Sequence, residues 1–138
     1  MSYLLDTNVI SELRKGQRAD AGVLAWLGSV PEAELYLSVL VVGELRQGVE
    51  RMRRRDPRSA EKLDQWLATL TSRYETRILV VNAHVAELWG RLNVPDPLPA
   101  VDGLLAATAL AHGLTLVTRN TRDVARSGAE LLNPFAKP

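Results

Sequence analysis

The sequence predicts an α/β protein, a three-layer α/β/α sandwich around a central parallel sheet of four to five strands. Short runs of apolar and β-branched residues alternate with longer segments in which apolar residues recur at helical spacing. Strands that alternate with helices form parallel sheets that are covered on both faces. The chain of 138 residues has no evident linker or repeat, which favours a single domain over residues 1–138.

Each predicted element follows from a local pattern. Strands are expected at 3–5, 35–38, 78–81 and 115–118, with a fifth at 130–132, and helices from Asp6 onward and over 20–30, 39–54, 57–74, 83–92 and 98–112. Ser38 has a side chain that can cap the following helix, and Gly113 stands just after a helix, where left-handed backbone is common. The proline-rich stretch NVPDPLP is expected to be a loop.

Composition excludes several classes of site and location. The chain has no cysteine and only two histidines, which excludes disulfides and thiolate metal sites and argues against a histidine zinc site. Its net charge of +1 indicates neither a nucleic-acid-binding nor an acidic protein. No apolar run reaches the roughly twenty residues of a membrane span, and the N-terminus lacks a signal-peptide pattern. We therefore expect a cytoplasmic protein.

Asp6 is the first residue with an unexpected position. It directly follows the apolar strand at residues 3–5. A lone ionised carboxylate is costly to bury, so Asp6 needs a partner. One interpretation is that it caps the following helix. The other is functional, because parallel α/β sheets place their binding crevice at the carboxyl ends of the strands.

Three further acids are expected at the same edge of the sheet. Glu44 borders an apolar helix face, Asp102 lies on an alanine-lined helix face, and Asp123 comes shortly after the strand at 115–118. Taken singly, each could be a capping or solvated residue. Together with Asp6 they would repel one another and raise one another's pKa. Such a cluster suits a hard cation, Mg²⁺ or Mn²⁺, which can activate water for phosphodiester cleavage.

Three motifs together resemble one protein family. They are DTNVIS at 6–11, SVLVVGELRQG at 38–48 and DGLLAATALAHGLTLVTRNTRDV at 102–124. The chain resembles the PIN-domain family and, more narrowly, the VapC-type toxins of bacterial toxin–antitoxin pairs, including the FitB-like branch. The resemblance implies a PIN-like sandwich and a Mg²⁺- or Mn²⁺-dependent endoribonuclease that acts on RNA. It also implies a homodimer and a VapB/FitA-like antitoxin partner. The protein would then contact DNA only indirectly, through that antitoxin.

The resemblance also assigns roles to residues. The positions that match the family's first three catalytic and metal-binding acids are Asp6, Glu44 and Asp102. Many members carry an aspartate where this chain has Asn120, so either Asp123 completes the catalytic set or Asn120 serves as a neutral ligand. The polar positions that support the acids are matched by Thr7, Asn8, Thr118 and Asn120.

Arginines could bring RNA to this acidic site. Six arginines lie between Arg46 and Arg58, which indicates either a phosphate-binding surface or a solvated helix end. The candidate RNA-binding residues are Arg46, Arg119 and Arg122. A competing hypothesis is a binding protein with a weak nuclease site, which acts mainly as a co-repressor together with its DNA-binding antitoxin. The departure from the family pattern at Asn120 supports that alternative.

Overall fold

The computed structural model describes residues 1–136 and contains a five-stranded sheet with the order β3-β2-β1-β4-β5. All neighbouring strands pair in parallel. The strands are β1 (Tyr3–Leu5), β2 (Leu35–Ser38), β3 (Ile78–Leu79), β4 (Thr115–Val117) and β5 (Leu131–Leu132). The predicted parallel sheet is therefore confirmed, and its fifth strand is present.

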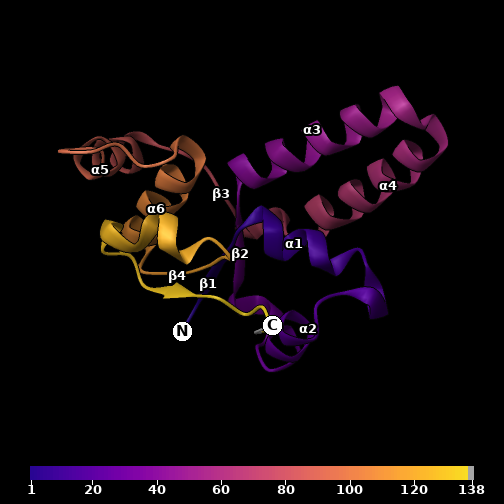
Figure 1. Ribbon diagram of the computed structural model, residues 1–138, viewed down its shortest axis with the longest axis horizontal. Helices are drawn as coiled ribbons and strands as arrows, with labels where there is room; N and C mark the ends of the chain where they lie inside the picture. Colours follow the sequence, from indigo (N-terminus) through magenta and orange to yellow (C-terminus); the bar gives the residue numbers. More distant parts are fainter. Residues whose placement is uncertain (137–138) are drawn as a thin grey trace.

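Helices cover the sheet on both sides, as predicted. The α-helices are α1 (Thr7–Leu13), α2 (Ala21–Gly28), α3 (Val39–Arg55), α4 (Pro57–Arg73), α5 (Ala83–Leu92) and α6 (Ala100–His112), and the 3₁₀ segments are η1 (Gly16–Arg18), η2 (Glu32–Glu34), η3 (Glu75–Arg77) and η4 (Thr121–Ser127). Helices α1 to α4 lie to one side of the strands, and α5 and α6 lie to the other (Figure 1). Right-handed crossovers explain this, because the chain runs outward from β1 to β3 and then returns to β4 and β5.

The strand order reverses beside β1. Leu4 of β1 pairs with Tyr36 of β2 on one side and with Leu116 of β4 on the other. In open α/β sheets, ligands bind outside the carboxyl ends of the strands at such a reversal. Asp6 and Thr118 are the first residues beyond β1 and β4. The fold therefore brings two predicted site residues to the mouth of this crevice.

The predicted caps and a buried core hold the elements in place. Ser38 Oγ accepts a hydrogen bond from the Leu40 N–H at 3.0 Å, and Gly113 ends α6 with φ of 65°. The helix predicted over 20–30 is shorter at both ends. It begins after Asp20, which acts as the N-cap of α2, and it ends at Gly28, before the C-cap Ser29. Leu5 of β1 is fully buried within the apolar core.

Several other boundaries differ from the prediction by one or two residues. β3 ends at Leu79 and does not reach Val81, because its pairing partner β2 turns into α3 after Ser38. α6 begins at Ala100, two residues later than predicted. The reason is Pro99, since the residue before a proline avoids helical backbone. Within residues 1–136, no helix is both long and apolar enough to cross a membrane.

Candidate active site

Asp6 connects the end of β1 to the start of α1. The residue is only 5% exposed, and its Oδ1 accepts a hydrogen bond from the Thr7 N–H at 2.7 Å. Its own N–H donates to the Val117 carbonyl of β4 at 2.9 Å. Asp6 is thus the N-cap of α1, as one interpretation predicted. It also lies at the reversal of strand order, which the functional interpretation requires.

A polar network from the end of β4 holds the Asp6 carboxylate. Thr118 Oγ1 donates to Asp6 Oδ2 at 2.7 Å, and Asn8 Nδ2 lies 3.4 Å from the same oxygen. Asn8 Oδ1 in turn accepts from the Arg119 N–H at 3.2 Å, and Thr118 Oγ1 accepts from the Asn120 N–H at 3.0 Å. The structure therefore places the predicted supporting residues around Asp6.

Glu44 reaches the same place from α3. The Thr7 hydroxyl donates to Glu44 Oε1 at 2.5 Å, which links the first turn of α1 to α3. Burial raises the pKa of Asp6, the hydrogen bonds from Thr118 and Thr7 oppose that rise, and the charge of Glu44 adds to it. The first two predicted acids are therefore close enough to interact.

Asp102 completes the cluster from the first turn of α6. It does not cap that helix, because the N-cap position belongs to Pro99. Burial, and then the charges of Asp6, Asp123 and Glu44, raise the pKa of Asp102 to about 6. All four predicted acids thus converge. Of the two candidates for the fourth position, Asp123 acts on Asp102 through its charge, whereas Asn120 contributes its backbone N–H to the network.

The cluster carries negative charge that its surroundings do not neutralise. The pKa values of Asp6 and Asp102 are both raised, and no lysine or arginine is among the groups that shift them. Within residues 1–136, no group of three acidic or histidine side chains is placed so that it could hold a metal ion directly. Mg²⁺ commonly binds through one or two carboxylates and keeps several waters. These residues therefore fit a hydrated divalent cation rather than an enclosed one.

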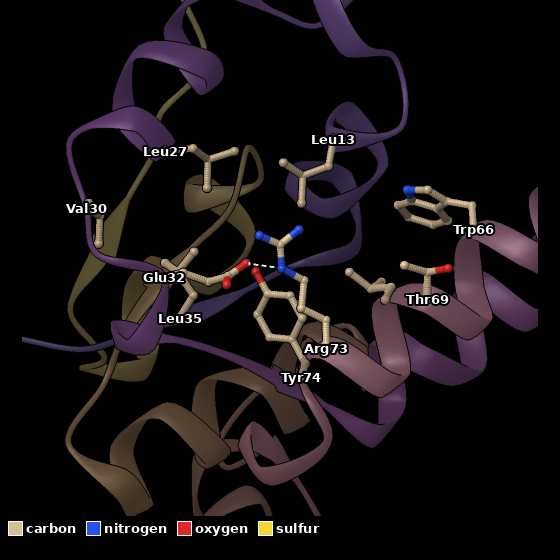
Figure 2. Close-up of a pocket in the computed structure, with 10 residues that line it drawn as sticks. Leu13, Leu27, Val30, Glu32, Leu35, Trp66, Thr69, Arg73 and Tyr74 are labelled. Atoms are coloured by element: carbon tan, nitrogen blue, oxygen red, sulfur yellow. Dashed lines mark ion pairs between the residues drawn. The ribbon is translucent and has the colours of Figure 1, made fainter.

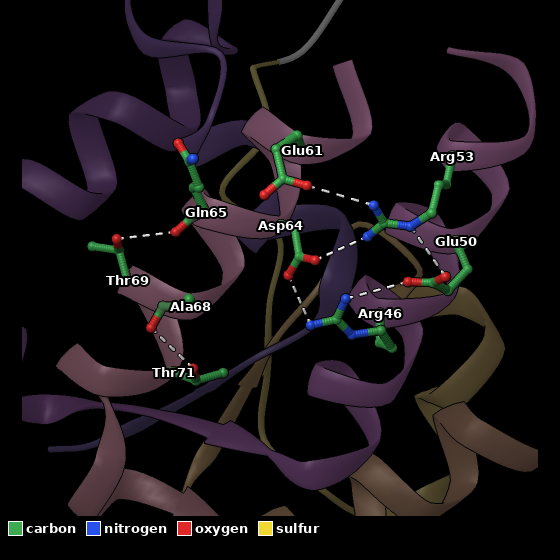
Figure 3. Close-up of polar contacts among 9 residues, drawn as sticks. All are labelled: Arg46, Glu50, Arg53, Glu61, Asp64, Gln65, Ala68, Thr69 and Thr71. Atoms are coloured by element: carbon green, nitrogen blue, oxygen red, sulfur yellow. Dashed lines mark hydrogen bonds and ion pairs between the residues drawn. The ribbon is translucent and has the colours of Figure 1, made fainter. Parts of the chain in front are cut away.

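The predicted RNA-binding arginines lie in different environments. Arg46 forms an ion pair with Asp64 of α4 at 3.0 Å and a second one within α3, both visible in Figure 3. The Arg119 guanidinium lies 4.6 Å from the centre of the Phe135 ring, and Arg122 is exposed in η4. The α3–α4 hairpin thus already pairs the charge of Arg46, and the role of this residue in RNA binding stays a prediction.

An apolar hollow of about 400 Å³ lies away from the acids. It is lined by Leu27 of α2, by Leu70 and Tyr74 of α4 and its C-cap, and by other side chains shown in Figure 2. Arg73 and Glu32, paired at 2.6 Å, add charge to its wall. None of the four acids lines it, so it is separate from the acidic site. The sequence did not indicate this hollow, because its walls come from segments far apart in the chain.

The comparison with known protein families agrees with this geometry. The family model of the PIN domain matches residues 3–128. The chain belongs to the PIN-domain family. This PIN domain is 35% identical to the VapC ribonuclease Y4jK of Sinorhizobium fredii over 96% of each chain. It is 34% identical to the toxin FitB of Neisseria gonorrhoeae over 96% of this chain and 97% of that protein.

Solved structures give the same grouping. The PIN domain matches FitAcB from Neisseria gonorrhoeae with a TM-score of 0.87 and 33% identity, over 96% of this chain and 97% of that one. It matches FitAB bound to the IR36 DNA fragment with a TM-score of 0.80 and 31% identity, over 99% and 97%. The predicted PIN-like sandwich and the VapC- and FitB-like membership are confirmed. The roles of the individual residues stay predictions.

Proposed function

We propose that this PIN domain is a Mg²⁺- or Mn²⁺-dependent endoribonuclease that serves as the toxin of a toxin–antitoxin pair. The observation that carries the proposal is the geometry at the reversal of strand order, where Thr7 joins Glu44 to Asp6 by hydrogen bonds and the charges of Asp6, Glu44 and Asp123 act on Asp102. Uncompensated carboxylates at the binding crevice of a parallel sheet call for a cation. The ribonuclease name of the relative from Sinorhizobium fredii supports RNA as the substrate.

In this proposal, one or two of the carboxylates of Asp6, Glu44 and Asp102 would bind the ion directly and the others would bind it through its waters, with Asp123 beside them. A bound ion supplies a water of lowered pKa and positive charge for the departing oxygen. Hydrogen bonds within the protein orient the carboxylates. The Thr7 N–H and the Thr118 hydroxyl each fix one oxygen of Asp6 at 2.7 Å, and the Thr7 hydroxyl fixes Glu44 Oε1 at 2.5 Å, so the protein orients both carboxylates. Such outer contacts tune the affinity of metal sites.

A VapB/FitA-like antitoxin is the partner that we infer. The similar solved structures FitAcB and FitAB support this, and the latter is bound to DNA. Contact of this chain with DNA would then be indirect, in keeping with its net charge of +1. The apolar hollow beside α2 and α4 offers a place for an apolar segment of that antitoxin (Figure 2). A homodimer remains part of the proposal.

The test is cleavage of a panel of structured RNAs by the purified protein with Mg²⁺, Mn²⁺ or a chelator. Asp6→Asn and Asp102→Asn are compared with Asp96→Asn, which changes an exposed acid of the loop before α6. We expect metal-dependent cutting that falls by about a hundredfold or more in the first two variants and persists in the third.

The competing co-repressor hypothesis makes the opposite prediction. The folded, antitoxin-free protein would then cut none of the RNAs with either metal, while the relative named as a ribonuclease, Y4jK of Sinorhizobium fredii, cuts them under the same conditions. That result would overturn the nuclease proposal. Cutting that persists in Asp6→Asn would leave a nuclease but would move its centre away from this cluster.

A further inference from the structure

We propose that a groove along α1 binds the RNA strand beside the scissile phosphate, with Arg14 and Lys62 as phosphate ligands and Trp66 as a stacking surface for a base. The proposal deepens the proposed nuclease function and rests on it for the identity of the strand. It concerns residues outside the acidic cluster.

Two adjoining hollows form this groove. The inner hollow, of about 100 Å³, is lined by Thr7 and Glu44 and extends to Arg14 and Trp66. The outer hollow, of about 190 Å³, is lined by Arg14, Lys62 and Trp66 among others. Arg14 and Trp66 line both hollows, so the two adjoin. Together they reach from Thr7 and Glu44 to the end of α1.

The reach of the groove suits a short stretch of nucleic acid. Thr7 and Arg14 are the two ends of α1, which with its C-cap spans about 10 Å at the rise of an α-helix. Nucleotides directly next to a phosphate at the acids would therefore arrive at Arg14. Ser11 lines the inner hollow midway along α1 and offers a hydroxyl to the strand.

The positive charge at the outer hollow favours a nucleic acid over a protein segment here. Arg14 and Lys62 are exposed, and neither forms an ion pair with any residue between 1 and 136. They line the outer hollow together with the half-buried ring of Trp66 on α4, which also lines the apolar hollow drawn in Figure 2. Proteins that bind single-stranded nucleic acid commonly present basic side chains, which contact the phosphates, beside aromatic side chains, which stack on the bases.

The groove also solves an electrostatic problem of the proposed function. The four acids repel the phosphates of a substrate, and Arg46 is already paired with Asp64 at 3.0 Å. Arg14 and Lys62 place positive charge at the other end of a groove that begins at the acids. They can therefore retain the strand without neutralising the carboxylates that hold the cation.

The test measures binding and cleavage separately. A labelled single-stranded RNA oligonucleotide of mixed sequence is titrated with the protein in chelator, and its anisotropy is followed at several salt concentrations. We expect Arg14→Ala and Lys62→Ala each to raise Kd several-fold and to reduce the salt slope by about 0.7. Trp66→Leu is expected to raise Kd about fivefold or more, with partial retention in Trp66→Phe. With Mn²⁺, KM should rise while kcat stays near its original value.

Arg91→Ala is the matched control, because Arg91 is an exposed arginine on α5, on the other side of the sheet (Figure 1). Binding that is unchanged from this control in Arg14→Ala and Lys62→Ala would overturn the proposal, even if the protein cuts RNA. Weaker binding in both would support the groove, even if no cutting is seen. Unchanged RNA binding together with weaker antitoxin binding would assign the groove to a protein segment. If Trp66→Leu fails to fold, the RNA binding of Arg14→Ala and Lys62→Ala decides the test.

Discussion

At the scale of single residues, the acids of this PIN domain are held in place at a cost. Asp6 is 5% exposed, and burial raises its pKa despite two hydrogen bonds. Burial and the charges of three acidic neighbours disfavour the ionised form of Asp102 and raise its pKa. Sites that concentrate like charge commonly sacrifice stability for function. The two predictions at this scale follow from that conflict.

Asp102→Asn should stabilise the folded protein near neutral pH. The folded pKa of about 6 lies above the reference value of 3.8, so the fold favours the protonated acid. Stability is therefore lost as pH rises from about 4 to about 6, and the cost is fully present above that range. We expect Asp102→Asn to raise the free energy of unfolding by about 1 kcal/mol at pH 7.5 and by almost nothing at pH 4. This value is smaller than the full pKa shift would give, because Asp102 is partly exposed and solvent screens its charge.

Urea unfolding with a chelator at both pH values measures this difference. Asp96→Asn, in the exposed loop before α6, is the matched control and should change little at either pH. Equal stability of Asp102→Asn and Asp96→Asn at pH 7.5 would contradict the electrostatic explanation.

Thr118→Val should destabilise the protein more than another buried Thr→Val change. The Thr118 hydroxyl donates to the Asp6 carboxylate at 2.7 Å, and the residue is 1% exposed. Its loss leaves a buried carboxylate short of a donor, at a cost of about 2 kcal/mol at pH 7. Because this hydrogen bond lowers the pKa of Asp6, the cost should shrink at acidic pH, where Asp6 takes up a proton.

Thr108→Val is the matched control for Thr118→Val. Thr108 is also fully buried, but its hydroxyl donates to the Leu104 carbonyl within α6 at 2.7 Å. Its replacement should cost about 1 kcal/mol and show no such pH dependence. Denaturant unfolding of both variants at pH 7 and pH 4 compares them, and parallel pH curves would contradict the proposed role of Thr118.

At the scale of elements, charged side chains bind α3 to α4. Asp64 accepts from Arg46 at 3.0 Å and from Arg53 at 2.9 Å, and Glu50 joins both arginines from α3 (Figure 3). Most arginines of the RQGVERMRRRDPR segment are exposed, but these two belong to the hairpin. The interpretation of this segment as a solvated helix end therefore does not account for Arg46 and Arg53. These two residues join α3 to α4 through Asp64.

Asp64→Asn should lower Tm slightly at neutral pH and low salt. Hydrogen bonds from Arg46, with the charges of both arginines, lower the pKa of Asp64. The stabilisation is therefore present above the ordinary aspartate pKa and is lost as pH falls below it. It should also fade in 1 M salt, because the pairs are partly exposed. Melting curves of Asp64→Asn and of Glu87→Gln, an exposed acid on α5, test this. A salt-independent difference between them would contradict it.

At the scale of the whole molecule, the acidic site and the apolar hollow can be altered separately. We expect Leu27→Asp to weaken antitoxin binding tenfold or more, because it places a charge in the wall of the hollow, and to leave metal-dependent RNA cleavage intact. Leu24→Asp on the same helix is the control, since Leu24 is already 40% exposed and does not line the hollow.

Calorimetric titration with the antitoxin and light scattering of the free protein separate the outcomes of that experiment. A dimer that dissociates in Leu27→Asp, with antitoxin binding unchanged, would assign the hollow to a second copy of this chain. Equal antitoxin binding by both variants would remove the hollow from the proposed interface.

The sequence by itself determined the elements and the acids. Strand and helix patterns depend on neighbouring residues, so the parallel sheet and the caps Ser38 and Gly113 could be predicted, with errors only where pairing or Pro99 set an end. Asp6 and Asp123 stood out because they follow apolar strands, and Glu44 and Asp102 because they border apolar helix faces. The order of the strands could not be deduced from such local patterns.

Only the tertiary structure decided which side chains meet. Thr118 and Asp6 are 112 positions apart, and Arg46 finds Asp64 only because α4 folds back along α3. The groove that joins Glu44 to Arg14 and Trp66 likewise arises where α1 meets α3 and α4. Contacts of this kind depend on packing in space rather than on spacing along the chain, and for that reason the sequence predicted the acids but not the surfaces around them.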